Sequence, residues 1–133
     1  MKHITFVLSL LLIVSCAHVS TTSSPLNVDG TWKGVYDSKG KNGQLPKLFI
    51  LKFKSDGGIL TGTGCDATTN PDKWYDLQKV KLKGNKLYFS GEPMPGLTFR
   101  FEGKIDGDIM NVTFRWDTPG GEASDSFTLE REK

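Results

Sequence analysis

The sequence predicts an all-β domain, an antiparallel up-and-down meander of about eight short strands that closes into a small barrel. Three observations predict this fold. Apolar and polar residues alternate with a period of two, which places one face of each strand in a core. Short turns rich in Gly, Asp and Asn separate these segments, as tight hairpins require. No segment after residue 28 has the spacing of an amphipathic helix.

Residues 97–116 show the alternation most clearly. Large apolar side chains recur at every second position on both sides of Asp106-Gly107-Asp108, a turn whose residues tolerate positive φ. The segment therefore predicts an antiparallel hairpin with one apolar face and one wet face. Similar turns at residues 54–58 and 83–86, each between alternating segments, extend this hairpin into a meander.

Two other segments depart from simple alternation. Residues 74–83 change phase midway, which predicts a β-bulge near Gln78 or Lys79. In residues 47–54, Leu48 and Ile50 lie opposite the main apolar face, which indicates that the outside of this strand is partly covered. The expected strands are residues 29–36, 47–54, 59–65, 74–83, 86–91, the two arms of the 97–116 hairpin, and 123–132.

Glycines on the apolar face favour a closed barrel over a two-sheet sandwich. Glycine weakens a strand, so its recurrence on the concave face indicates sites of sharp curvature. Closure also removes exposed sheet edges. The glycines in phase with large apolar residues are Gly34, Gly62, Gly64, Gly91 and Gly103.

The charge balance argues against nucleic acid as a partner. The formal net charge is only +2 over 133 residues, whereas phosphate binding needs a concentrated basic surface. The nearest approach to one is the run Lys79, Lys81, Lys83 and Lys86. We interpret it as a solvated strand face whose charges discourage edge-to-edge pairing.

The N-terminus has the features of an export signal. A short basic start precedes an apolar run at residues 4–14 that is too short to span a bilayer. The following Ile13-Val14-Ser15-Cys16 resembles the bacterial lipobox. The resemblance implies a lipoprotein signal peptide over residues 1–15 and lipid attachment at Cys16. Ordinary cleavage after Ala17 is the alternative.

The resemblance also implies a location and a domain organisation. Because Ala17 rather than Asp follows the cysteine, an outer-membrane lipoprotein that faces the periplasm or the surface is favoured over one kept at the inner membrane. Residues 16–28, rich in Ser and Thr, are expected to form a flexible tether after the lipidated Cys16. Residues 29–133 are then the barrel domain.

The folded part offers little for catalysis. Both histidines precede residue 29, which excludes Ser-His-Asp and Cys-His nucleophiles and imidazole-bound zinc there. Cys65 is expected to be a small buried hydrophobe, with a redox role as the alternative. Asp106 and Asp108 are expected to serve the turn rather than bind calcium. We therefore predict no enzyme activity, no catalytic residue, no cofactor and no metal.

Gly30-Thr31-Trp32, at the start of the first strand, resembles the G-x-W motif of the lipocalins and the wider calycin group. The resemblance implies a Trp that closes one barrel end beneath a basic side chain from the last strand. Arg131 lies on the inward face with Phe127 and Leu129, so it is the expected partner of Trp32, stacked on the indole. Trp32 and Arg131 are thus expected to be structural.

Two functions remain open. The first is a lipid-anchored, non-catalytic binding module for a small apolar ligand or glycan fragment, with its mouth opposite Trp32 and near Trp116. The alternative is a periplasmic protein-interaction or inhibitor barrel that acts on a lysozyme or protease. Whether the interior aromatic residues line a cavity or only fill the barrel also stays open. The candidate ligand-binding residues are Tyr36, Trp74, Phe99, Phe101, Phe114 and Trp116.

Overall fold

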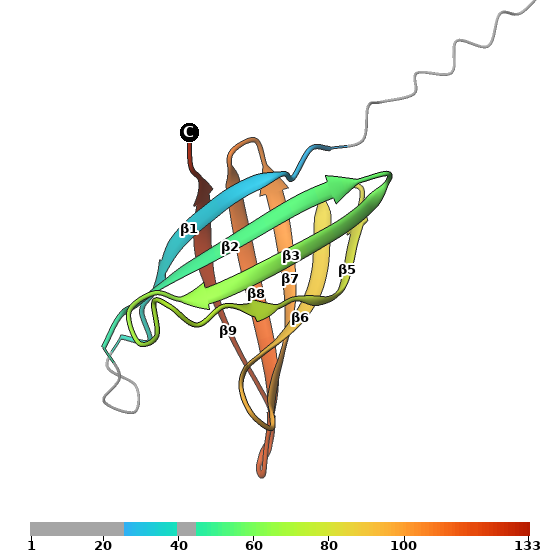
Figure 1. Ribbon diagram of the computed structural model, residues 1–133. Helices are drawn as coiled ribbons and strands as arrows, with labels where there is room; N and C mark the ends of the chain where they lie inside the picture. The colour runs from blue at the N-terminus through green and yellow to red at the C-terminus, as the bar shows by residue number, and fades with distance from the viewer. Residues whose placement is uncertain (1–25, 40–44) are drawn as a thin grey trace, which may run out of the picture.

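The computed structural model of the protein describes residues 26–39 and 45–133 (Figure 1). Nine antiparallel strands form one sheet in these residues, and no helix within them is long and apolar enough to cross a membrane. The strands are β1 (Gly30–Tyr36), β2 (Lys47–Asp56), β3 (Ile59–Asp66), β4 (Tyr75–Asp76), β5 (Gln78–Lys83), β6 (Lys86–Met94), β7 (Leu97–Asp106), β8 (Ile109–Thr118) and β9 (Gly121–Arg131).

The sheet is a meander that is nearly closed into a barrel, which confirms the predicted fold class. Its strand order is β4-β3-β2-β1-β9-β8-β7-β6-β5, so the first strand pairs with the last. Figure 1 shows β1, β2 and β3 crossing in front of the more upright β7, β8 and β9. The C-terminus, the segment before β1 and the β2–β3 turn lie toward the same end, and the β8–β9 turn projects at the other.

The segment expected as one strand over residues 74–83 closes the barrel and is divided into β4 and β5. Tyr75 in β4 pairs with Gly64 of β3, and the Leu77 amide donates a hydrogen bond to the Gly62 carbonyl at 2.9 Å. The next residue, Gln78, pairs with β6 instead. The register then shifts between Gln78 and Lys81, which confirms the predicted bulge. β3 and β5 are not paired with each other in the described sheet.

Glycines on the inner face make room for the closing strand. A Cβ atom at Gly64 would lie 2.8 Å from the Tyr75 ring, and one at Gly91 would lie 2.9 Å from it. Tyr75 therefore occupies space on both sides of the seam that only glycine leaves open. At these two positions, glycine is required on the inner face because a larger residue would clash with the Tyr75 ring.

The segment before β1 belongs to the core, which corrects one expected boundary. We expect a tether over residues 16–28, but Val28 is 1% exposed and Leu26 packs against the buried core. The buried Trp32 indole also donates a hydrogen bond from Nε1 to the Val28 carbonyl at 3.0 Å. The folded domain therefore includes residues 26–28, because two of their three side chains find apolar partners. The expected signal peptide and the expected lipid attachment site, Cys16, lie outside the described residues.

Trp32 and Arg131 make the contact that the sequence predicts, and we call this pair the plug. The two residues face each other across β1 and β9, and the Arg131 guanidinium lies 4.5 Å from the Trp32 ring centre. Arg131 also donates to the carbonyls of Asp29 at 3.1 Å and Asn27 at 2.9 Å, and its Nε lies 3.1 Å from Asp108 Oδ1. The plug thus joins β1 and β9 to the N-terminal segment and the β7–β8 turn.

The outer face of β2 is partly covered, as its two apolar faces predict. Ile50 of β2 pairs with Cys65 of β3, and the Cys65 Sγ atom lies 3.4 Å from the Asn70 carbonyl oxygen. The chain that follows β3 therefore folds back over this face. Cys65 is a fully buried free thiol, as expected for a small hydrophobe, and burial raises its pKa.

Replacing the plug indole should strongly destabilise the domain. Trp32 is fully buried, so Trp32→Ala should lower the free energy of unfolding by about 3 to 5 kcal/mol, as large aromatic truncations in cores do. Urea unfolding measures the change. Trp74→Ala is the matched control, because Trp74 is 40% exposed and should change stability far less. Equal losses for the two variants would contradict a closing role for Trp32.

Candidate binding cleft

Five of the six candidate ligand-binding residues meet at the barrel end away from the plug. Tyr36, Phe99, Phe101, Phe114 and Trp116, together with Phe127, form what we call the aromatic cluster. Ring centroids lie 5.2 Å apart for Tyr36 and Phe114, and 5.3 Å apart for Phe114 and Trp116. Rings at these distances pack directly against one another. Phe114 is buried at the centre of these contacts, and the other five rings are partly buried around it.

Trp74, the sixth candidate, does not join the aromatic cluster. It lies just before β4 and is 40% exposed, with the Lys52 ammonium 4.6 Å from its ring centre. Because Lys52 is an exposed residue of β2, this cation–π pair lies on the outer surface of the barrel. The structure therefore separates Trp74 from the other five candidates.

A carboxylate that the sequence analysis did not select lies beside the aromatic cluster. The Tyr36 hydroxyl donates a hydrogen bond to Asp125 Oδ2 at 2.6 Å, and Asp125 pairs with Phe114 across β8 and β9. Asp125 is two residues from Phe127, in phase with the inward-facing side chains. That phase is the signal that could have identified it. Burial, followed by the Asp125 hydrogen bond and charge, raises the pKa of Tyr36 to about 12.

The Tyr36–Asp125 pair predicts a measurable alkaline titration. Removing the carboxylate charge with Asp125→Asn should lower the Tyr36 pKa in an ultraviolet titration of the folded protein, because a nearby anion opposes tyrosinate formation. Tyr75 is the internal control: burial is the main cause that raises its pKa to about 12, so it should not respond. The assignment is wrong if the Tyr36 pKa is unchanged.

The raised pKa of Tyr36 also predicts how the stability of the folded domain depends on pH. The folded-state pKa of Tyr36 lies above the ordinary tyrosine value of about 10. The stability that its neutral phenol contributes is therefore fully present below pH of about 10 and is lost as the pH rises toward 12.

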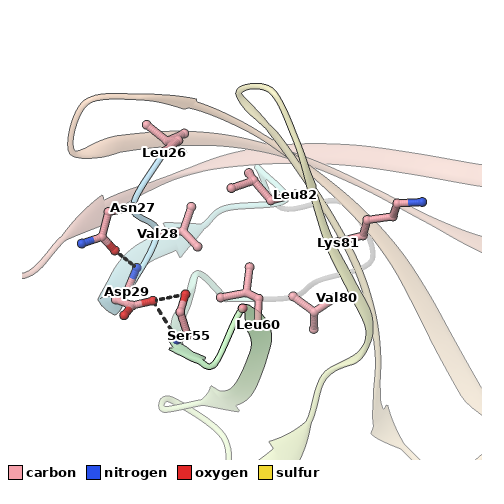
Figure 2. Close-up of a pocket in the computed structure, with 10 residues that line it drawn as sticks. Leu26, Asn27, Val28, Asp29, Ser55, Leu60, Val80, Lys81 and Leu82 are labelled. Atoms are coloured by element: carbon pink, nitrogen blue, oxygen red, sulfur yellow. Dashed lines mark hydrogen bonds between the residues drawn. The ribbon is translucent and has the colours of Figure 1, made fainter. Parts of the chain in front are cut away.

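The cleft that we consider the candidate binding site lies at the plug end. It has a volume of about 680 Å³ and is bounded by the N-terminal segment, the β2–β3 hairpin and β5 (Figure 2). These walls meet where β3 and β5 are not paired, so the cleft occupies the incompletely closed side of the barrel. This position differs from that of the expected mouth, which the sequence analysis places opposite the plug and beside Trp116.

The cleft has an apolar floor and one organised polar wall. On that wall, Asp29 Oδ1 accepts hydrogen bonds from the Ser55 amide at 2.9 Å and the Ser55 hydroxyl at 2.8 Å, and Asn27 Oδ1 accepts one from the Asp29 amide at 2.9 Å. Figure 2 shows Lys81 on the other side, with its ammonium reaching outward from the rim. The apolar residues are Leu26, Val28, Leu60, Val80 and Leu82.

A second, smaller cleft of about 510 Å³ lies against β1, β2 and β3 and includes Lys52, Lys54 and Asp76. None of the six candidate residues lines either of these two clefts. In the part of the chain that the structure describes, no three His, Cys, Asp or Glu side chains lie close enough together to hold a metal ion.

Comparison of this chain with protein-family models, with curated proteins and with solved structures finds no match in any of the three. The features that bear on function are the plug, the aromatic cluster and the cleft.

Proposed function

We propose that this chain is a lipid-anchored, non-catalytic binding module of the bacterial cell envelope, and that it holds a small apolar ligand in the cleft beside the plug. One observation carries the proposal: an apolar cleft of about 680 Å³ remains where β3 and β5 do not pair. Ligand sites in proteins are typically concave, mostly apolar and about 300 to 1,000 Å³ in volume.

The floor of the cleft retains apolar surface that a ligand would cover. Leu26, Leu60, Val80 and Leu82 pack against the core but are only partly buried. Covering such surface contributes about 25 cal/mol for each Å² removed from water. Most rings of the aromatic cluster are also only partly buried, but they contact one another and line neither of the two clefts.

The chain enters the described part of the domain at the cleft. Residues 1–25 lie outside the described part, but the chain enters the domain at Leu26, which is itself a wall of the cleft. Nine residues lie between Cys16 and Leu26, and the ten residue steps of an extended chain reach at most about 35 Å. A lipid on Cys16 would therefore keep the cleft near the membrane surface.

A second candidate function is the protein-interaction or inhibitor barrel. Val35 is 56% exposed on the outer face of β1 and pairs with Leu48 of β2, and Leu45, just before β2, is 80% exposed. Exposed apolar side chains such as these can form part of an interaction surface. In this second candidate function, the partner would be a lysozyme or a protease.

Loss of an apolar side chain in the cleft should weaken binding of a neutral apolar probe. Leu82→Gln should raise the dissociation constant for N-phenylnaphthylamine about tenfold, because the ligand would lose apolar contact and meet an amide. The measurement is a fluorescence titration. Leu97→Gln is the matched control, since Leu97 is also partly buried but lies at the start of β7, away from the cleft.

Trp116→Phe, which keeps the fully buried Trp32, locates the probe in the same experiment, because the part of the emission change that it removes belongs to Trp116. Trp32 donates to the carbonyl of Val28, a cleft residue, so its emission should change on binding while that of Trp116 does not. A response from Trp116 alone would place the ligand at the aromatic cluster. No saturable binding at all would contradict the proposal and leave the interaction barrel as the better candidate.

The anchor is tested separately. Cys16→Ser should move the protein from the membrane fraction to the soluble fraction, or stall its processing, because the lipid would have no attachment site. Immunoblots of fractionated cells give the result, with Cys65→Ser as the matched control at the buried thiol. Membrane association that survives Cys16→Ser would show that the anchor is not this cysteine.

A further inference from the structure

The charges around the cleft are unequal on its two sides. β5, which forms one wall, carries Lys79, Lys81 and Lys83, all exposed. None of these three ammonium groups forms an ion pair with any residue of the described chain. The nearby Lys86 differs, since it lies 3.6 Å from Glu102. The β5 wall therefore carries uncompensated positive charge.

The acid in the cleft is held on the opposite wall. Asp29 Oδ1 accepts two hydrogen bonds from Ser55, which fix the carboxylate beside the β2–β3 hairpin. Figure 2 shows Leu60, Val80 and Leu82 between this polar wall and Lys81. A molecule that lies on these apolar side chains could thus place one end beside the lysines without approaching the carboxylate.

An added β-strand is a poorer occupant of this gap. Exposed lysines along an edge strand oppose pairing with another strand, and β5 has them at every second position from Lys79 to Lys83. The same lysines favour an anionic group at the rim, because each long side chain can bring its ammonium to a ligand while its methylene stem covers apolar surface.

We propose that the cleft takes a long-chain anionic amphiphile, whose apolar chain lies on Leu60, Val80 and Leu82 and whose carboxylate or phosphate pairs with Lys81, supported by Lys79 and Lys83. The proposal rests on the proposed function and names the ligand class for that site. A free fatty acid and a single-chain phospholipid both have this chemistry.

Matched amphiphiles test the head-group preference in the full mature protein. Dodecanoate, dodecyl maltoside and dodecyltrimethylammonium share one chain length and carry an anionic, a neutral and a cationic head. Isothermal titration with monomeric ligand should show that dodecanoate binds about tenfold more tightly than the cationic ligand. Added salt should weaken binding of dodecanoate and leave that of the maltoside unchanged.

Lysine variants test the residues. Lys81→Gln should weaken dodecanoate binding about threefold, and the triple change of Lys79, Lys81 and Lys83 to Gln about tenfold, with no effect on the maltoside. Lys73→Gln is the matched control, because Lys73 is exposed, has no ion pair within the described residues and does not line the cleft. A titration with lysophosphatidic acid distinguishes a single-chain phospholipid from a free fatty acid as the ligand. Tighter binding than that of dodecanoate favours the phospholipid, and weaker binding favours the fatty acid.

The outcomes separate this inference from the proposed function. Equal binding of all three dodecyl ligands, or dodecanoate binding that the triple variant does not weaken, would overturn the anionic preference and leave the apolar cleft in place. Failure of all ligands, including the neutral one, would overturn both.

Discussion

The stacked contact between Trp32 and Arg131 is the interaction on which the rest of the structure depends. It joins the first and last strands of the meander, which must pair for the sheet to curve into a barrel. The same guanidinium bonds to the backbone of the segment before β1 and approaches Asp108 in the β7–β8 turn. A planar cation with several donors can make these contacts together, which an ammonium group cannot.

The opposite seam of the sheet is closed less completely, and this difference creates the cleft. At the seam, Tyr75 fits against Gly64 and Gly91, and the Leu77 amide bonds to the Gly62 carbonyl. After the bulge, β5 pairs with β6, and β3 and β5 do not pair with each other. The cleft between them is floored by Val28, whose carbonyl holds the Trp32 indole. A ligand there would contact the segment that the plug organises.

The two ends of the barrel therefore differ in chemistry. The end away from the plug is filled by the aromatic cluster, where the Tyr36 phenol is held by Asp125. The plug end combines a cation–π contact with a cleft whose floor is aliphatic, whose one wall is polar and whose rim carries Lys81. Aromatic rings pack against one another by edge and face contacts, whereas the aliphatic floor of the cleft is only partly covered by neighbouring side chains.

Local pattern in the sequence determined most of the strands, the hairpin turns and the bulge near Lys79, because alternation and phase are properties of neighbouring residues. The Trp32–Arg131 contact was predicted from the resemblance of Gly30-Thr31-Trp32 to the G-x-W motif, and the inward phase of Arg131 identified the partner. Only the tertiary structure decided where the barrel stays open, because that depends on the register of strands far apart in the chain. The same reason explains why Val28 belongs to the core and why Leu60 and Val80, twenty residues apart, share one cleft. The polar composition of residues 16–28 predicts a tether, but Val28 is buried in one cluster with Trp32 of β1, Leu51 of β2 and Leu129 of β9, which only the folded sheet brings together.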